Sequence, residues 1–442
     1  MRSEKQVATS VVNKLQTAGF EAYLAGGCVR DMLLGKDPKD YDITTSAKPE
    51  QIEKLFNKTV DIGKEFGTII VIEQGQSIDV TTFRAEGPYS DNRRPDFIKF
   101  TTAEEDASRR DFTINALFFD PFKNKLIDFV GGEDDVKRRT IRFVGNPNER
   151  IHEDHLRILR AIRFKTSLGF SYVDDTRLAI KSKIGLVANV AVERLRDELN
   201  SIFSSSNRHI GFVELSEFGA FDILLPEIEA QKGVPQPIEY HHEGDVFTHI
   251  YLCLKSLPSD APLYLVWATL LHDIAKPQTL TRKNGRILFH DHAQISAEIA
   301  RAILKRLKFP NFEIEIIAWL IHNHMKIGDI EKMRPFKRMG FLLDQRFPSL
   351  LELARADSFG TYPINTSLVE QMEKKLSDAI SRRDESLKIK KGNLINGDDL
   401  IAAGLAPSEK FGEILEDAND YSILNKVPKA ATLLYIKTKY QI

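Results

Sequence analysis

The stretch that most constrains this chain of 442 residues is a glycine pair followed by two alternating aspartates. Gly26 and Gly27 end a short apolar run, and Arg30 follows them. Glycine lets a backbone approach a phosphate closely, and an arginine adds a charge-assisted contact. Asp40 and Asp42 are one residue apart, so on an extended segment both carboxylates face the same side. Singly, these pieces also suit a turn and a surface acidic patch; together they predict a phosphate cradle beside Mg²⁺ ligands.

A third carboxylate, Asp79, extends this acidic set. It lies in the second of two segments rich in β-branched residues, 68–73 and 77–83, which are expected to form a hairpin. The alternative is an acid on an exposed strand face. With helices expected around them, these strands predict an α/β head with a small mixed sheet.

Length and composition predict a soluble protein of several domains. A chain of 442 residues exceeds what one core normally holds, and 42% hydrophobic and 28% charged residues are typical of globular proteins. No stretch approaches about 18 apolar residues and no signal-peptide core is seen, so we expect no membrane segment and a cytoplasmic location. The two cysteines predict no disulfide framework. The oligomeric state is left open.

Beyond residue 136 the pattern is helical nearly to the C-terminus, with prolines between the helices. Residues 137–210 hold 15 Lys and Arg against 8 Asp and Glu, an excess that suits a phosphate backbone or a solvated helical face. The expected domains are a head (1–136), an all-α neck (137–205), a helical body (206–360) with an HD-type domain at about 241–360, and a helical tail (361–442).

One expected neck helix carries polar side chains at a spacing of three. Asp154, Arg157, Arg160 and Arg163 recur between apolar residues and lie on neighbouring turns. Aspartate accepts and arginine donates hydrogen bonds, so the set can satisfy the edge of a nucleobase or hold a phosphate. The alternative is an ordinary ion pair, which does not require three arginines.

Histidines cluster in the second half of the chain. Six of the 11 fall between residues 249 and 324. Neutral imidazole together with carboxylate is a metal-ligand set. The ordered series of histidines and aspartates therefore predicts a metal site in this part of the chain.

Two resemblances follow from these motifs. Between Gly26 and Phe164 the chain resembles the class II tRNA nucleotidyltransferases, which are the CCA-adding enzymes and their bacterial poly(A) polymerase relatives. The matching stretches are GGCVRD with DYD, VTTFR, RRDFTINAL, the D-x3-G-x2-D turn ending in Ile141-Arg142, and EDHLRILRAIRF. The C-terminal H…HD…D series resembles the HD phosphohydrolase superfamily, with a match at His249, His272, Asp273 and Asp357 and with His292 and His324 as auxiliary ligands. The first resemblance implies an α+β head of the nucleotidyltransferase (polymerase β-like) type.

The first resemblance implies roles for individual residues. Gly26, Gly27 and Arg30 are expected to hold a nucleoside triphosphate, and Asp40 and Asp42 to bind Mg²⁺, with Asp79 as a third catalytic carboxylate. The other expected nucleotide-binding residues are Arg110 and Asn115, which support the site, Asp154 and Arg157, which select the base, and Arg160 and Arg163, which assist at the nucleotide. The HD resemblance implies a divalent transition metal or Mg²⁺ at the histidine cluster.

The expected function is the template-independent addition of CCA from CTP and ATP to tRNA 3′ ends, with phosphohydrolase activity in the HD domain. Residues 86–94 correspond to the family's flexible loop, and the tail is expected to hold the tRNA elbow. Addition of A alone and poly(A) synthesis remain alternatives, although VTTFRAEGPY replaces the basic stretch that tends to mark poly(A) polymerases. An alternative of another class is an HD phosphohydrolase with an RNA-binding head.

Overall fold

The computed structural model describes residues 3–89, 95–388, 395–407, 410–425 and 427–440. Residues 90–94 of the expected flexible loop lie outside this set. The chain divides into two compact units, Met1–Pro226 and Glu227–Ile442, which are described separately. The boundaries of the four expected domains stay predictions.

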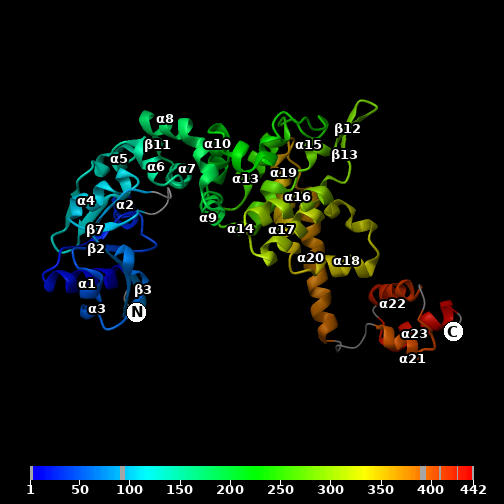
Figure 1. Ribbon diagram of the computed structural model, residues 1–442. Helices are drawn as coiled ribbons and strands as arrows, with labels where there is room; N and C mark the ends of the chain where they lie inside the picture. Colours follow the sequence, from blue (N-terminus) through cyan, green and yellow to red (C-terminus); the bar gives the residue numbers. More distant parts are fainter. Residues whose placement is uncertain (1–2, 90–94, 389–394, 408–409, 426, 441–442) are drawn as a thin grey trace. The chain divides into compact units, whose positions relative to one another are not determined.

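The first unit is built on a seven-stranded sheet in the order β3-β4-β5-β2-β1-β8-β9 (Figure 1). Strand β2 pairs antiparallel with β1 and parallel with β5, so the predicted mixed sheet is confirmed. Its strands are β1 (Ala22–Ala25), β2 (Asp42–Thr45), β3 (Thr59–Gly63), β4 (Thr68–Glu73), β5 (Gln76–Thr82), β8 (Leu117–Asp120) and β9 (Lys125–Asp128).

Helix α1 (Glu4–Thr17) supplies core to one side of this sheet. Val7, Val11 and Leu15 recur at helical spacing and are fully or almost fully buried, and Ser3 begins the helix with a capping box. The other head elements are α2 (Gly27–Leu33), α3 (Pro49–Leu55), α4 (Ala103–Ser108), α5 (Gly132–Arg138), η1 (Lys64–Phe66), η2 (Thr113–Asn115), β6 (Arg84–Glu86) and β7 (Ile98–Phe100).

Strand register places the acidic residues. Ile43 on β2 pairs with Val80 on β5 in a parallel ladder, so Asp42 and Asp79 each precede a paired residue. Neighbours at the same register point to the same face of a sheet. Asp42 also pairs with Ala25 on β1, which brings it to the strand end from which the glycine pair continues.

The helices after the head pack closely on one another. α7 (Arg157–Leu168) contacts α9 (Val192–Phe203) and α10 (Arg208–Glu217). A Cβ on Gly211 would lie 2.4 Å from Ile202 Cγ2, so this crossing requires glycine. The remaining elements are β10 (Thr140–Ile141), α6 (Pro147–Glu153), β11 (Ser171–Tyr172), α8 (Asp174–Lys183), η3 (Ile184–Asn189), α11 (Ala220–Leu224) and α12 (Pro226–Glu229), the last at the division between the units.

The second unit is helical with one hairpin that the sequence analysis did not include. β12 (Leu280–Lys283) and β13 (Arg286–Phe289) pair antiparallel across Asn284 and Gly285, both with positive φ. Asn-Gly is a usual sequence of such a turn, but the flanking strands, LTRK and RILF, show no alternation of polar and apolar residues. The helices are α13 (Val246–Ser256), α14 (Leu263–Leu271), α15 (Lys276–Thr279), α16 (His292–Arg306), α17 (Asn311–Asn323), η4 (His324–Lys332), α18 (Pro335–Leu342), α19 (Phe347–Gly360), α20 (Ser367–Lys388), α21 (Gly397–Ala402), α22 (Phe411–Asn425) and α23 (Lys429–Tyr440).

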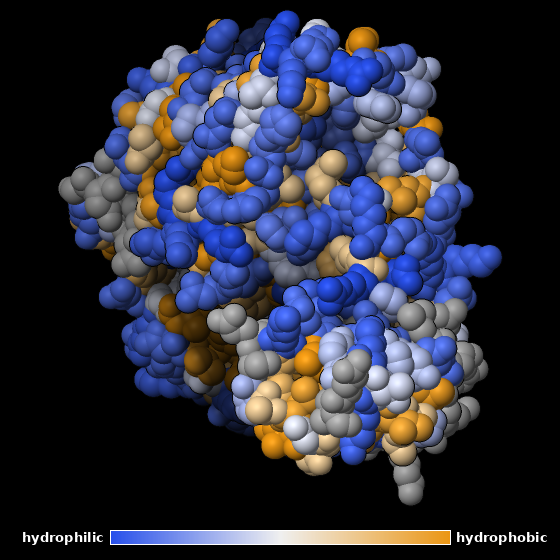
Figure 2. All heavy atoms as spheres, turned by 90° about the vertical axis from the view of Figure 1, so that its right-hand side faces the viewer, coloured by the Kyte–Doolittle hydropathy of each residue, from blue (hydrophilic) through white to orange (hydrophobic). Residues whose placement is uncertain are grey.

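Within the described parts of the chain, no helix is long and apolar enough to span a bilayer. The face seen in Figure 2 is largely hydrophilic, with hydrophobic residues interspersed.

Candidate functional site

The first unit contains a cavity of about 650 Å³. Its lining comes from the sheet, from the glycine turn and from α7, so it gathers motifs that are far apart in the sequence. Of the predicted head and neck residues, the lining includes Gly26, Gly27, Arg30, Asp42, Asp79, Arg110, Asn115, Asp154, Arg157, Arg160 and Arg163. Asp40 is exposed and does not line it.

Two strand carboxylates, Asp42 and Asp79, line the sheet side of the cavity. Asp42 and Asp79 remain accessible to solvent. Partial desolvation, followed by the charge of Asp79, raises the pKa of Asp42 although Arg110 opposes this. Partial desolvation and the charge of Asp40 likewise raise the pKa of Asp79. Like charges held together in this way are relieved by a divalent cation, so the donor set fits a metal site.

The glycine turn and two arginines form the neighbouring wall. Gly26 has φ +75°, a conformation that favours glycine, and a Cβ there would lie 3.2 Å from Arg110 Nη1. Arg30 Nη1 donates to Asn115 Oδ1 at 2.6 Å, and Arg110 Nη1 donates to the Asn115 carbonyl at 3.1 Å. Asn115 therefore orients both guanidinium groups beside the turn.

The arginines of α7 are each held by a carboxylate. Arg160 Nε donates to Asp111 Oδ2 at 2.8 Å, and Arg163 Nε donates to Glu198 Oε1 at 2.5 Å. Burial opposes ionisation of Asp111, but the charge and hydrogen bond of Arg160, together with the charge of Arg157, outweigh it and lower the pKa of Asp111 to about 2. These pairs fix the direction of the guanidinium groups that line the cavity.

The expected single helix through residues 153–164 is wrong at its start. α6 ends at Glu153, α7 begins at Arg157, and Asp154 between them has extended backbone. The Asp154 side chain accepts the backbone N–H of Leu156 at 3.1 Å, a local hydrogen bond that competes with helix formation. Asp154 and Arg157 nevertheless both line the cavity.

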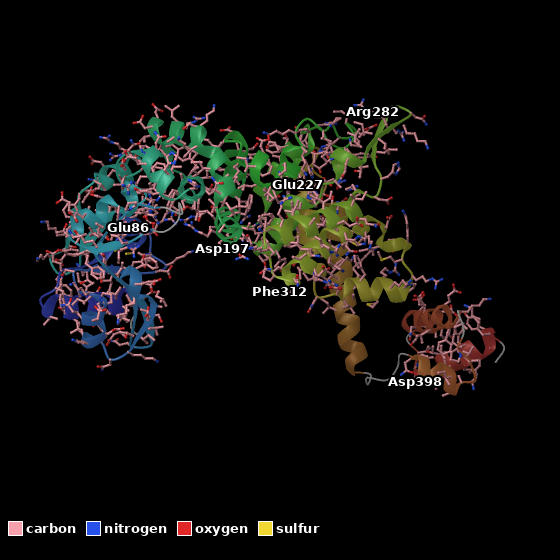
Figure 3. All side chains as sticks on the ribbon, in the orientation of Figure 1. Glu86, Asp197, Glu227, Arg282, Phe312 and Asp398 are labelled. Carbon is pink, nitrogen blue, oxygen red and sulfur yellow. The ribbon has the colours of Figure 1, made fainter. Side chains whose placement is uncertain are left out.

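The structure adds cavity residues that the sequence analysis missed. Arg194 on α9 donates to both oxygens of Asp154, at 3.0 and 2.7 Å. Glu86, labelled in Figure 3, accepts hydrogen bonds from Arg84 and from Arg109, the latter at 2.8 Å. Asp154 and Arg194 are 40 residues apart, so local spacing carried no signal for their pairing. In all, eight arginines and five carboxylates line the cavity, an excess of positive charge that suits a polyphosphate.

The second unit brings the predicted HD residues together. His249 lies on α13, His272 and Asp273 follow α14, and Asp357 lies on α19. His249 Nε2 is 3.0 Å from Asp357 Oδ1, and His272 Nε2 is 3.3 Å from Asp273 Oδ2. His292 Nε2 and His324 Nε2 lie 3.4 and 3.9 Å from the other Asp273 oxygen. The cluster therefore forms two ligand groups joined by Asp273.

Backbone carbonyls set the histidine tautomers. The Nδ1 atoms of His249, His272, His292 and His324 face the carbonyl oxygens of Gly360, Thr269, Phe289 and Ile321 at 3.1, 2.8, 3.0 and 2.6 Å. A carbonyl only accepts, so each Nδ1 carries a proton, and in the neutral imidazole the Nε2 lone pair then faces the cluster.

The cluster fits a divalent metal. His272 Nε2 and Asp273 Oδ1 are buried and make no hydrogen bond within the described residues, an arrangement that is costly unless a ligand satisfies them. The Lys276 ammonium, 2.6 Å from Asp273 Oδ2, supplies one positive charge at the edge of the group. Nε2 and carboxylate oxygens facing one point are a donor set for such an ion.

Comparisons with known proteins agree with this picture. Residues 22–142 match the poly A polymerase head domain, residues 169–232 a probable RNA-binding site of that polymerase, and residues 240–362 the HD domain. The CCA-adding enzyme of Ligilactobacillus salivarius is 47% identical over 212 residues, which are 48% of this chain and 52% of that enzyme. The enzyme of Latilactobacillus sakei is 38% identical over 264 residues, 58% of this chain and 66% of that enzyme.

The chain thus spans about half the length of the curated relatives it matches. A crystal structure of the Bacillus stearothermophilus CCA-adding enzyme in complex with CTP superimposes with a TM-score of 0.73 at 25% identity, covering 100% of this chain and 98% of that one. Both the head and HD families use divalent metals. The chain thus matches a poly A polymerase head domain and an HD domain, and proteins similar to it over about half of their length are named CCA-adding enzymes.

Proposed function

We propose that this protein is a template-independent RNA nucleotidyltransferase that adds CCA to tRNA 3′ ends from CTP and ATP. The observation that carries the proposal is the single cavity in which Asp42 and Asp79, the glycine turn, and the Asp154–Arg194 pair all meet. One wall suits a metal-bound triphosphate, and the opposite side offers hydrogen bonds to a base without a nucleic-acid template.

The chain's residues divide the work of nucleotide transfer. Arg30 and Arg110, oriented by Asn115, neutralise phosphate charge beside Gly26 and Gly27. Asp42 and Asp79, with Asp40 nearby, would hold Mg²⁺, which when bound would stabilise the charge that develops as the terminal ribose hydroxyl attacks the α-phosphate and pyrophosphate leaves. The Asp154 carboxylate accepts hydrogen bonds from the incoming base, and the Arg157 guanidinium donates hydrogen bonds to it.

A panel of primers tests the product. Transcripts ending at the discriminator base, at C and at CC are each incubated with Mg²⁺ and CTP, ATP or both. CCA addition predicts two C residues on the first transcript with CTP alone, and a single A on the CC transcript with ATP. Addition of A only to CC would favour an A-adding enzyme, and long A tracts would favour a poly(A) polymerase.

A second activity is supported by the HD cluster. We propose that it holds a divalent transition metal or Mg²⁺ and hydrolyses phosphate esters of nucleotides or RNA ends, because buried Nε2 and carboxylate atoms converge beside the partly exposed Asp357. With each metal, we would measure phosphate release from nucleoside monophosphates and the opening of 2′,3′-cyclic phosphate ends to monoesters. Release that persists in Asp273→Ala would contradict the assignment.

A further inference from the structure

The HD cluster contains one donor atom outside the H…HD…D series. Cys253 lies on α13, one helical turn after His249, and its side chain is fully buried. Its Sγ is 3.3 Å from His249 Nε2, the same nitrogen that lies 3.0 Å from Asp357 Oδ1. Cys253, His249, His272 and Asp357 offer ligand atoms that all lie within 4.8 Å of one another.

These spacings suit one ion. Zinc-type ions bind sulfur at about 2.3 Å and imidazole nitrogen at about 2.1 Å, so two tetrahedral ligand atoms are roughly 3.5 Å apart. The distance of 3.3 Å between Cys253 Sγ and His249 Nε2 is close to this value. A second observation points to a ligand at the same place, since His272 Nε2 is fully buried and has no hydrogen-bond partner within the described residues.

The packing of α19 against α13 keeps the sulfur in this position. A Cβ on Gly360 would lie 2.2 Å from Cys253 Sγ and 3.1 Å from His249 Cε1, so only glycine lets α19 come this close. The Gly360 carbonyl also faces His249 Nδ1. One residue therefore makes room for the thiol and orients the imidazole next to it.

We propose that Cys253 is a metal ligand of the HD centre and makes that centre selective for thiophilic divalent ions such as Zn²⁺, Fe²⁺ or Co²⁺ over Mg²⁺ and Mn²⁺. The inference rests on the proposed HD metal centre and adds a thiolate to it. On binding, the S–H bond breaks, its proton passes to solvent, and a metal–sulfur bond forms. Thiolate is a soft donor, whereas the head offers only carboxylates, so the two centres of the chain prefer different ions.

Cobalt spectroscopy on the full chain tests this assignment. The chelator-treated protein is titrated with Co²⁺ while the visible ligand-field bands and the near-ultraviolet thiolate-to-cobalt band are recorded. The expected result is that both appear together, that Cys253→Ser and Cys253→Ala lose the near-ultraviolet band, and that Cys28→Ser keeps it. Competition with Zn²⁺ should show about a tenfold or greater loss of affinity in the Cys253 variants, while affinity for Mn²⁺ changes little.

The outcomes separate the ligand from the centre. Ligand-field bands that disappear in His272→Ala, without any near-ultraviolet band in the unaltered protein, would overturn the role of Cys253 and leave the HD metal centre standing. A cobalt spectrum unaffected by His272→Ala would contradict the centre itself and the thiolate with it. Alkylation of Cys253, followed by mass spectrometry, gives a check without spectroscopy: bound Zn²⁺ should slow it, and an unchanged rate would contradict ligation.

Discussion

At the scale of single residues, the cavity of the first unit contains carboxylates, Asp42 and Asp79, whose ionisation destabilises the folded chain. Asp42 and Asp79 lie on neighbouring parallel strands. Besides burial, the charge of Asp79 raises the pKa of Asp42, and the charge of Asp40 raises the pKa of both. Such repulsion is typical of sites that gain a cation during function. The arginines on the far side are, by contrast, each paired with a carboxylate.

The stability of the metal-free protein should reveal this repulsion in Asp42→Asn. The pKa of Asp42 is raised in the fold, so the folded state binds the proton more tightly than the unfolded chain does. The free energy of unfolding therefore falls as pH rises above about 4, and the variant escapes that loss. In chelator at pH 7 we expect Asp42→Asn to melt at a higher temperature than the unaltered protein.

The same comparison at pH 3.5 is the control, because both proteins then carry a neutral group there and the gap should narrow. Mg²⁺ with nucleotide should stabilise the unaltered protein more than the variant, and incorporation by the variant should fall by at least about a hundredfold. A lower melting temperature at pH 7 would contradict the repulsion.

Asp154 gives the second residue-scale prediction. Because its carboxylate holds Arg194 and lines the base side of the cavity, Asp154→Ala should reduce discrimination between CTP and ATP, by about tenfold or more, beyond its effect on total incorporation. The measurement is kcat/KM for each nucleotide on the same primer.

The matched control is Asp197→Ala on α9, an exposed carboxylate labelled in Figure 3 that pairs with the adjacent Arg196. Its selectivity should be unchanged. Equal discrimination by Asp154→Ala and the unaltered enzyme would refute a base-reading role.

At the scale of elements, α5 and η2 support the phosphate side of the cavity. A Cβ on Gly132, the first residue of α5, would lie 2.1 Å from the Thr113 carbonyl oxygen in η2. Thr113 Oγ1 donates to Asp135 Oδ2 at 2.6 Å, which joins the two elements, and η2 also carries Asn115. The contact between these short elements thus sets the positions of Arg30 and Arg110.

Gly132→Ala should separate α5 from η2. We expect a loss of about 1–3 kcal/mol in the free energy of unfolding, typical of overpacking, with a rise in KM for nucleotide because Asn115 moves. Gly185→Ala in η3 is the control, because a Cβ there meets nothing within 4 Å. The measurements are unfolding in denaturant and KM for nucleotide. A loss of stability without a change in KM would contradict a role of η2 in nucleotide binding.

At the scale of the whole molecule, the chain carries two candidate metal centres, one in each compact unit. Each centre is complete within its own unit, since the cavity of the first lies within residues 25–194 and the HD ligands lie within residues 249–357. Nothing in the ligand sets makes one depend on the other.

The two activities should therefore be separable. Asp42→Ala is expected to abolish nucleotide incorporation and to leave cobalt binding by the HD cluster unchanged. Asp273→Ala is expected to do the reverse, with incorporation within about twofold of the unaltered rate. Nucleotide incorporation and cobalt binding are both measured on the same preparations. Loss of incorporation in folded Asp273→Ala would show that the centres are coupled.

Elements that depend on local sequence patterns were predicted from the sequence, and elements without such a pattern were not. The β-branched residues of segments 68–73 and 77–83 predicted the hairpin of β4 and β5. The hairpin of β12 and β13 was not predicted because its short strands show no alternation of polar and apolar residues. The break at Asp154 escaped because a side chain's hydrogen bond to its own backbone overrides helical spacing.

By itself, the sequence determined the chemistry present in the chain: a glycine turn with alternating aspartates, an arginine series, and histidines paired with aspartates. These are properties of residue type and short spacing. Only the tertiary structure decided which groups meet, because strand register sets Asp42 beside Asp79 and helix packing sets Arg194 on Asp154. The approach of α19 to α13 at Gly360 likewise places Cys253 among the HD ligands, a contact that depends on packing across more than 100 residues of chain.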